Sequence, residues 1–343
     1  IKVFNPSDSN ACGYDPYYLL KTSDERDSEA KAIAIALIPL PAESTKDPHW
    51  IQSAQNFLAG AILYFQEKGS SFAETVYQVQ YMDSRELIDE IMFSTNDEAR
   101  LFMSKFRTMD DKELGSVMST LSNYIMPFAT DKNLQRALNG KGDCITPNDL
   151  ENGKDVFINI EEHKLRIWSG LVTLIVNQFC NAFEQRKEGN QNPILFLLDE
   201  FARLGKIEAM IGGLATLRSK KIHIAIMIQS LAQLDLIYGK PARQVIADQC
   251  PYKMVLRATD ADTQEYFSKL IGTYDKEKLS SNINADMMGM GKGTGMSKTT
   301  EEKRIIKPEE FAFLQDAVCL FPTGYHRIEK VPYYEDSNFK TKI

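Results

Sequence analysis

The sequence predicts an α/β protein whose parallel sheet is interrupted by a long all-helical segment. After about residue 150, short apolar runs alternate with helical patterns, whereas residues 20 to 145 show helical periodicity throughout. One apolar run, Ile194 to Leu198, stops abruptly at two adjacent carboxylates, Asp199 and Glu200. Buried runs that alternate with helices are typical of parallel strands joined by right-handed crossovers. At 343 residues the chain has room for two domains.

The composition, 43% apolar and 25% charged residues, is that of a soluble globular protein. No run of 18 apolar residues is present, so we expect no membrane span within this chain. The first residues lack the pattern of a signal peptide and are typical of a strand already under way, which indicates a piece of a longer protein. The five cysteines are widely spaced without a Cys-x-x-Cys pair, which favours a reduced, cytosolic protein without a zinc site.

The negative charge is concentrated in the helical segment. The chain has a net charge of −7, and residues 21–150 contain 13 basic and 20 acidic side chains, so the remainder is balanced. Such a segment is a poor candidate for binding a phosphate backbone. An acidic surface favours a basic protein partner over a nucleic acid, but an ordinary solvated helical face is the commoner explanation of such charge.

In the N-terminal half, residues 1–5 predict a strand that Asn5-Pro6 closes. Helices are expected from Thr22 to Ile38 and, with Asp47 as N-cap, from Pro48 to Gly69. Helical stripes continue from Ser71 to Leu138, and Asn96 is expected to cap one of these helices. One face of the helix over residues 50–65 is apolar: Trp50, Ala54, Phe57, Leu58, Ala61, Ile62 and Phe65.

The C-terminal half predicts strands and helices in alternation. The expected elements are strands at Val156–Ile160, 193–198, His223–Gln229 and Tyr252–Arg257, helices at Leu165–Phe183, Ile207–Leu217 and Asp260–Leu270, and a hairpin of Ala317–Phe321 with His326–Val331. Residues 280–300 are low in complexity and are expected to form a loop. The segment Met290 to Thr299 superficially resembles a phosphate loop, but no Gly-x-x-x-x-Gly-Lys-Ser/Thr frame fits it.

Asp199 and Glu200 follow a predicted buried strand, where open α/β sheets bind ligands. In nucleotide-hydrolysing motors the first such acid supports Mg²⁺ and the second handles the attacking water. Gln229 ends the next predicted strand, and a βαβ unit brings both strand ends to one edge of the sheet. Its amide can both donate and accept, which suits sensing a γ-phosphate. The alternatives are two solvated acids at a strand end and an ordinary strand-end glutamine.

Basic residues accompany these acids. Arg218 lies near the end of the intervening predicted helix, where it either compensates the helix dipole or serves as an arginine finger for a neighbouring subunit. Arg203 and Lys206 follow the acids closely, and we expect salt bridges from them.

The segments Ile194–Gly205, Leu217–Lys221 and Gln229–Leu234 together resemble the type IV secretion coupling proteins, the TraG/TraD-like hexameric ATPases of bacterial conjugation. Weaker similarity extends along the chain: Val3–Pro6, residues 50–65, Asp260–Gly272 and Tyr333–Asp336. The resemblance implies a RecA-like P-loop NTPase motor domain made of residues 1–20 and 150–343. It also implies an all-α substrate-recognition domain at residues 21–149.

The resemblance further implies ATP and Mg²⁺ as cofactors. Asp199 would hold Mg²⁺ through water, Glu200 would be the catalytic base, Arg218 the finger acting in trans and Gln229 the sensor. The implied partners are a relaxase or effector proteins bound through the all-α domain, single-stranded DNA, secretion-channel ATPases and further copies in a homo-hexamer. The implied location is the cytoplasmic face of the bacterial cell membrane.

The family's transmembrane anchor and Walker A motif do not occur in these 343 residues, and the family places the Walker A motif upstream of the first strand. We therefore expect this chain alone neither to bind ATP tightly nor to hydrolyse it. Two other functions fit the same residues: a hexameric DNA translocase of the chromosome-segregation type, and a non-catalytic substrate receptor of the same fold.

Overall fold

The computed structural model describes residues 1–40, 48–189, 191–283, 294–332 and 334–336. Its contacts divide the chain into two compact units. The first unit comprises Ile1–Ile228 and Leu234–Ile246, and the second comprises Gln229–Gln233 and Ala247–Ile343.

The helical segment of the first unit leaves and returns at neighbouring strands. Strand β1 (Lys2–Phe4) pairs in parallel with β4 (Val156–Ile158), although the whole helical segment lies between them in sequence. A second parallel pair, β2 (Gly13–Tyr14) with β3 (Cys144–Ile145), lies inside the first in sequence. The predicted insertion of helices after the first strand is therefore confirmed.

The insertion begins with α1 (Tyr18–Thr22), α2 (Arg26–Leu37), α3 (His49–Glu67), α4 (Phe72–Tyr81) and α5 (Ser84–Met92). It continues with α6 (Asp97–Met103), the 3₁₀ turn η1 (Phe106–Thr108), α7 (Asp111–Thr130) and α8 (Lys132–Ala137), and α9 (Pro147–Glu151) leads back to β4. Asn96 caps α6 as predicted, because its side chain accepts the N–H of Ala99 at 2.8 Å. The predicted cap Asp47 lies outside the described residues.

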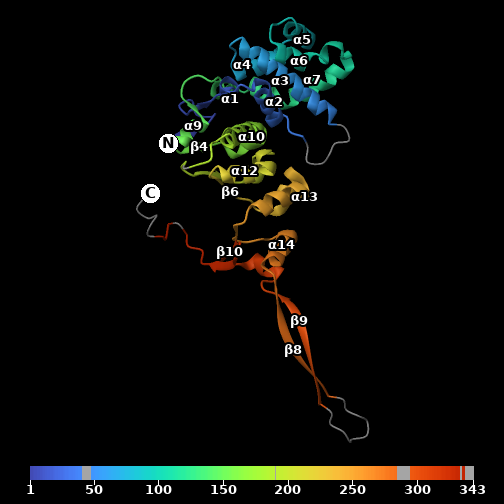
Figure 1. The fold of residues 1–343 in the computed structure, drawn as a ribbon, viewed down its shortest axis with the longest axis vertical. Coiled ribbons are helices and arrows are strands. Elements are labelled where there is room, and N and C mark those ends of the chain that lie inside the picture. The colour runs from blue at the N-terminus through green and yellow to red at the C-terminus, as the bar shows by residue number, and fades with distance from the viewer. Residues whose placement is uncertain (41–47, 190, 284–293, 333, 337–343) are drawn as a thin grey trace. The chain divides into compact units, whose positions relative to one another are not determined.

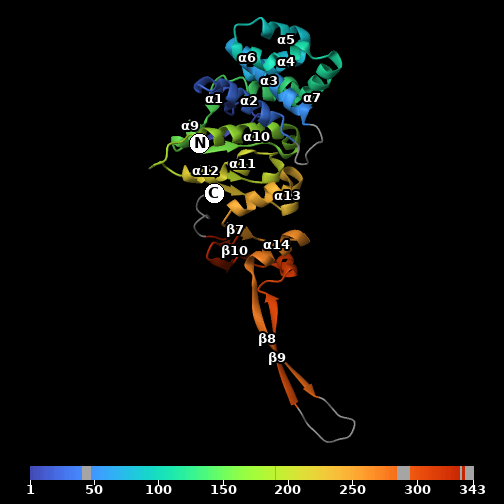
Figure 2. The ribbon, with the colours of Figure 1, turned by 45° about the vertical axis from the view of Figure 1, so that its right-hand side comes forward.

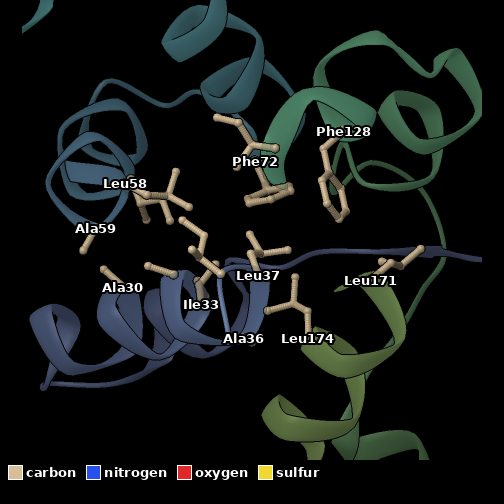
Figure 3. Close-up of a cluster of buried hydrophobic side chains, with 14 of the residues drawn as sticks. Ala30, Ile33, Ala36, Leu37, Leu58, Ala59, Phe72, Phe128, Leu171 and Leu174 are labelled. Atoms are coloured by element: carbon tan, nitrogen blue, oxygen red, sulfur yellow. The ribbon is translucent and has the colours of Figure 1, made fainter. Parts of the chain in front are cut away.

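The helical insertion and the α/β part of the first unit share one hydrophobic core. Buried side chains of α2, α3, α4 and α7 meet those of the long helix α10 (Glu162–Glu184), which confirms the predicted helix at Leu165–Phe183 (Figure 3). Leu37, Phe72, Phe128, Leu171 and Leu174 are among the side chains in this cluster. Because α10 supplies part of this core, the insertion is anchored on the α/β part through apolar contacts.

Strand β5 (Ile194–Leu198) and strand β6 (Ile222–Ile226) form a parallel pair with Leu198 opposite Ile226. Between them lie the 3₁₀ turn η2 (Phe201–Arg203) and the helices α11 (Ala209–Gly212) and α12 (Leu214–Ser219). The single helix predicted at Ile207–Leu217 is thus wrong. The chain divides at the Gly212-Gly213 pair, where a Cβ on Gly213 would lie 2.8 Å from the Ala209 carbonyl oxygen.

The second unit is a small antiparallel sheet covered by a helix. Strand β10 (Ala317–Phe321) lies between β7 (Lys253–Val255) and β11 (Gly324–Ile328), and α14 (Ala261–Ile271) packs on the 3₁₀ turn η3 (Pro308–Phe313). The helix and the hairpin were predicted. Among the described strands, β7 has one partner, β10, and the two pair antiparallel. Helix α13 (Leu231–Gln249), which precedes β7, is kinked at Gly239.

A two-stranded ribbon, β8 (Thr273–Ile283) with β9 (Thr294–Arg304), projects from the body of the second unit beyond α14 (Figures 1 and 2). The prediction of loop over residues 280–300 is wrong at both ends of that range, while residues 284–293 lie outside the described residues. Most residues of both strands are polar and the few apolar ones do not alternate with them, so the sequence has no apolar period that indicates a strand.

Across the described ranges, no helix is both long and apolar enough to cross a membrane.

Candidate nucleotide site

The two acids follow directly on the last residue of β5. The N–H of Met227 donates to the carbonyl of Leu198 at 3.0 Å, and the N–H of Phe201 donates to the carbonyl of Met227 at 2.9 Å. These bonds extend the β5–β6 ladder past the end of both strands. Asp199 and Glu200 therefore lie at the carboxyl edge of a parallel pair, the edge at which open α/β sheets bind ligands.

A left-handed residue forms the turn at this edge. Glu200 has φ 47° and ψ 43°, a conformation that is uncommon for residues other than glycine and costs about 1–3 kcal/mol. Asp199 Oδ1 accepts the N–H of Glu200 at 2.9 Å. The next residue, Phe201, is fully buried and stacks on Tyr238 with ring centroids 5.6 Å apart. Burial of Phe201 thus stabilises the strained turn that presents both carboxylates.

The turn ends against helix α10 at Gly205. Gly205 has φ 87°, and a Cβ built there would lie 2.7 Å from the Oγ1 of Thr173. That hydroxyl donates to the carbonyl of Leu204 at 2.8 Å. Tyr238 completes the support, since its hydroxyl accepts the N–H of Ile207 at 3.0 Å. The Asp-Glu-Phe-x-x-Leu-Gly motif therefore has a structural basis: two presented acids, a buried anchor and a glycine in close contact with a helix.

Arg203 connects Glu200, the candidate catalytic base, to helix α10. Its Nε lies 2.9 Å from Oε2 of Glu200, and its Nη1 donates to Oε1 of Glu162 at 2.5 Å. The hydrogen bond to Glu162, followed by the charge of Glu200, raises the pKa of the Arg203 guanidinium. Lys206 pairs with Glu208 at 2.9 Å. The salt bridges expected of Arg203 and Lys206 are thus present.

The exposed carboxylate of Asp199 fits a magnesium site. Its Oδ2 makes no hydrogen bond or ion pair with any described residue. Within the described ranges, no three His, Cys, Asp or Glu side chains are grouped closely enough to hold a metal ion by themselves. Mg²⁺ keeps several waters and uses one or two carboxylates together with substrate phosphates, which is the chemistry that Asp199 offers.

Arg218 lies on α12, away from the acids of its own chain. The chain passes from α12 into the start of β6, and Ile222 there is opposite Ile194, the first residue of β5. The acids follow the other end of β5, about 13 Å along the strand at about 3.3 Å per residue. The Arg218 side chain is exposed and pairs with no described residue.

Gln229 does not end a strand, which corrects the sequence prediction. Strand β6 ends at Ile226, and Gln229 lies in the loop before α13, with an exposed side chain. Its N–H donates to Oε1 of Gln233 at 3.2 Å, and the two side-chain amides also bond to each other. By its contacts Gln229 belongs to the second unit, whereas Asp199 and Glu200 belong to the first. The strand ends three residues before Gln229, and Ser230 is already the N-cap of the next helix.

Sequence reasoning missed the residues that support the turn. Thr173 and Tyr238 lie 26 and 39 residues from Asp199 and belong to helices with no motif of their own. The only available signal was the motif itself, since a phenylalanine and a glycine at fixed offsets from two acids imply partners elsewhere in the fold.

Comparison with known proteins identifies the family. The whole sequence, residues 1–343, matches the family described as type IV secretory system conjugative DNA transfer. The chain belongs to this family. It is 25% identical to the protein VirD4 of Rhizobium radiobacter over 98% of this chain and 50% of that protein. It is 20% identical to the coupling protein TraD of Escherichia coli K12 over 93% of this chain and 43% of that protein. The chain thus spans about half the length of these curated relatives.

Solved structures of the conjugative coupling protein TrwB share the fold of this family member. The unbound form matches with a TM-score of 0.74 at 19% identity, over 96% of this chain and 73% of that chain. A further form, TrwB in complex with ADP and Mg²⁺, matches with a TM-score of 0.71 at 17% identity and the same 96% coverage of this chain. The predicted fold class, a RecA-like P-loop NTPase sheet with an inserted all-α domain, is confirmed.

Proposed function

We propose that this chain is the motor part of a coupling ATPase that recruits relaxase–DNA or effector protein substrates to a type IV secretion channel and drives their transfer by ATP hydrolysis. The observation that carries the proposal is the rigid presentation of Asp199 and Glu200 at the carboxyl edge of β5. Membership of the conjugative DNA transfer family supports it, as does the similarity in fold to TrwB, which binds ADP and Mg²⁺ in one of its solved forms.

In this proposal Asp199 holds Mg²⁺ through water, and Glu200 accepts the proton of the water that attacks the γ-phosphate. When bound, Mg²⁺ would neutralise part of the negative charge of the phosphates. Arg203 fixes the direction of the Glu200 carboxylate through the 2.9 Å contact. Gln229 is the γ-phosphate sensor, supported by its exposed amide next to the N-terminus of α13.

Arg218 is proposed as an arginine finger that acts on the site of a neighbouring copy in a homo-hexamer. It lies near the start of β6, toward the end of the β5–β6 pair opposite to the acids of its own chain, and its guanidinium has no partner among the described residues. Because Arg218 lies away from Asp199 and Glu200 of its own chain, we infer that it stabilises the phosphate charge in a site supplied by another subunit.

Residues 21–149 are proposed as the substrate-recognition domain, for a relaxase or for effector proteins. The excess of acidic side chains there supports a basic partner. Single-stranded DNA and the ATPases of the secretion channel are proposed as further partners of the assembled protein. The working location is proposed to be the cytoplasmic face of the cell membrane.

The proposal is tested by nucleotide binding and hydrolysis with the full-length protein and its Glu200→Gln variant. We expect the variant to bind ATP with unchanged affinity and to hydrolyse it about 10²–10⁴-fold more slowly, because general base catalysis is lost. Residues 1–343 alone are expected to show no hydrolysis. Full activity of the variant, or activity of the 343-residue chain, would contradict this assignment.

The two alternatives predict different outcomes. A non-catalytic receptor would bind its substrate without hydrolysing ATP in any form of the protein. A DNA translocase of the chromosome-segregation type would be stimulated by double-stranded DNA and would not capture a relaxase. The capture experiment should use the whole chain, because residues 21–149 share their core with α10 and would expose Leu37 and Phe128 if they were cut away.

A further inference from the structure

The turn that carries Arg218 from α12 into β6 contains a second left-handed residue. Lys221 has φ 58°, which is uncommon for residues other than glycine and costs about 1–3 kcal/mol. Its N–H donates to the carbonyl of Arg218 at 3.1 Å, so Arg218 is itself part of this strained turn. We name residues 218–221 the finger turn. Strained residues persist only where the surrounding structure holds them, and they are concentrated at functional sites.

The guanidinium of Arg186 holds the finger turn from below. Arg186 follows helix α10, and its side chain is only 5% exposed. Its Nη1 donates to the carbonyl of Lys220 at 2.8 Å. Its Nη2 donates to the carbonyl of Asn192, just before β5, and to Oε2 of Glu151 at the end of α9, both at 2.8 Å. One guanidinium thus joins the finger turn to three other segments, α9, the end of α10 and the start of β5 (Figures 1 and 2).

The backbone on both sides of Arg218 is fixed, while its side chain is exposed. Leu217, directly before it, is fully buried. After it, the carbonyl of Lys221 accepts the N–H of Ile194 at 3.1 Å, which ties the turn to the start of β5. A group that must reach the site of another subunit needs this combination, because its starting point is set in advance and only the side chain has to find its position.

A second acid contacts the finger turn more weakly. Oε1 of Glu188 accepts the hydroxyl of Ser219 at 3.2 Å and lies 3.6 Å from Nζ of Lys220. The Glu188 side chain is 68% exposed, and exposed pairs of this kind contribute about 0–1 kcal/mol. The hydrogen bonds of the buried Arg186 are charge-assisted and are not screened in this way. The finger turn therefore depends mainly on Arg186.

The stability of the fold alone does not explain a buried arginine here. Nε of Arg186 is buried and has no hydrogen-bond partner within the described residues. The desolvation of a buried ion pair also offsets much of its attraction, so the pair with Glu151 adds little net stability. What the planar fork provides is direction, since it binds three acceptors at once in fixed geometry, and a lysine ammonium has no such fork.

We propose that Arg186 is a positioning residue for the arginine finger. Its fork fixes the carbonyl of Lys220 and thereby the direction in which Arg218 leaves its own subunit. This role rests on the proposed ATPase activity and on Arg218 acting in trans. Lys220 precedes the start of β6, whereas Asp199 and Glu200 follow the end of β5, so Arg186 serves the site of the neighbouring subunit and not the site of its own.

Mixed assemblies of the full-length protein test this asymmetry. In the reference mixture, Glu200→Gln subunits supply the finger and Arg218→Ala subunits supply the acids. The Arg186→Lys protein is then mixed in equal amounts with each of these two proteins. With Glu200→Gln it has to supply only the acids, and an intact finger comes from its partner. With Arg218→Ala it has to supply the finger.

We expect Arg186→Lys alone to lower kcat at least tenfold, because a misplaced finger stabilises the phosphate charge poorly. Its mixture with Glu200→Gln should recover to the level of the reference mixture. Its mixture with Arg218→Ala should not exceed the activity of Arg186→Lys alone. The matched control is Glu188→Gln, which alters the exposed contact to the same turn and should lower kcat less than twofold.

Three results would overturn the positioning role while the reference mixture recovers. Full activity of Arg186→Lys alone would show that the fork is not needed. Recovery in neither mixture would show a general structural role. Recovery only with Arg218→Ala would show that Arg186 acts on the acids of its own chain. Failure of the reference mixture itself would contradict the finger in trans, and with it the role of Arg186.

Hydrogen exchange without nucleotide adds a measurement that does not depend on activity. In Arg186→Lys the amides of Lys220 and Lys221 should exchange at least tenfold faster. The amide of Phe201, which donates to Met227 beside the acids, should be unchanged. Equal acceleration at Phe201 would indicate general destabilisation and overturn the role. Glu151→Gln keeps the guanidinium and removes only the charge of its partner, so it should give the same pattern more weakly, and it replaces Arg186→Lys in the mixtures if the lysine variant does not fold.

Discussion

The guanidinium of Arg203 binds Glu200 in the same turn, with Arg203 Nε 2.9 Å from Glu200 Oε2. Nη1 of the same guanidinium donates to Oε1 of Glu162 on α10. The proposed base is therefore oriented by a cation that is itself fixed to the helix below the strand. Oriented catalytic groups lower the reaction barrier because their freedom is already lost in the ground state.

This contact predicts a positioning role for Arg203. In the full-length protein, Arg203→Met should lower kcat for ATP hydrolysis about tenfold with little change in KM, because binding does not depend on the direction of Glu200. Arg203→Lys should recover part of the loss. Glu162→Gln, which removes only the second partner of Arg203, serves as the matched control and should have a smaller effect. An increase in KM at unchanged kcat would contradict the role.

The trans action of Arg218 predicts complementation between inactive subunits. Arg218→Ala and Glu200→Gln proteins should each be inactive alone. Mixed in equal amounts, they should recover activity, since about a quarter of the subunit interfaces would then combine an intact glutamate with an intact arginine. Lys220→Ala, which alters a neighbouring cation, should remain active. Failure of the mixture to recover activity, while mixed assembly is demonstrated, would exclude a finger in trans.

The contact between Gly205 and α10 predicts a large loss of stability on substitution. Gly205→Ala should lower the free energy of unfolding by about 2–4 kcal/mol, because a Cβ meets Thr173 Oγ1 at 2.7 Å and φ is positive. Gly153→Ala is the matched control. Gly153 also has a positive φ, 72°, but its Cβ would meet no atom within 4 Å, so the loss should be about 1 kcal/mol.

Denaturant unfolding measures the free energies of unfolding of the Gly205→Ala and Gly153→Ala variants, so the two losses of stability can be compared directly. Thr173→Ala opens space for the added methyl group, so the double variant should lose less stability than the sum of the two single variants. Strict additivity would show that the clash with Thr173 is not the cause.

A buried acid on α2 predicts a pH dependence of stability. Glu29 is 8% exposed, its Oε2 has no hydrogen-bond partner within the described residues, and burial together with the nearby Glu25 raises the pKa of its carboxyl. The native state therefore disfavours the ionised form. Stability is unaffected below the ordinary pKa of the carboxyl and falls as the pH rises through the raised native value.

Glu29→Gln should remove this fall and increase stability at neutral pH by up to about 1–2 kcal/mol, with no gain at pH values below the ordinary pKa. Thermal unfolding as a function of pH measures the difference. Asp27→Asn, which changes an exposed acid on the same helix, should leave the pH dependence unchanged. A stabilisation by Glu29→Gln that is the same at all pH values would exclude ionisation as the cause.

Local patterns predicted the elements whose side chains repeat with a clear period. The apolar run from Ile194 to Leu198 and the helical stripe of α10 are formed as expected, and Asn96 caps α6. The predictions were wrong where such a period is missing. The sequence of the ribbon β8–β9 has no regular apolar repeat, and the strand predicted to reach Gln229 ends at Ile226, four residues before Ser230, the N-cap of α13.

The sequence by itself determined the family, the α/β class with its helical insertion, and the pair of acids at a strand end, because these features are local in the chain or are repeated at fixed spacing. Only the tertiary structure decided how those acids are held. Phe201 stacks on Tyr238, Gly205 contacts Thr173, and Arg203 joins Glu200 to Glu162. Apart from the Arg203–Glu200 pair, each contact joins the turn to a distant part of the sequence. The partners are 37 positions apart for Phe201 and Tyr238, 41 for Arg203 and Glu162, and 32 for Gly205 and Thr173. Such contacts follow from how β5 packs on its neighbouring helices, which no local pattern in the sequence specifies.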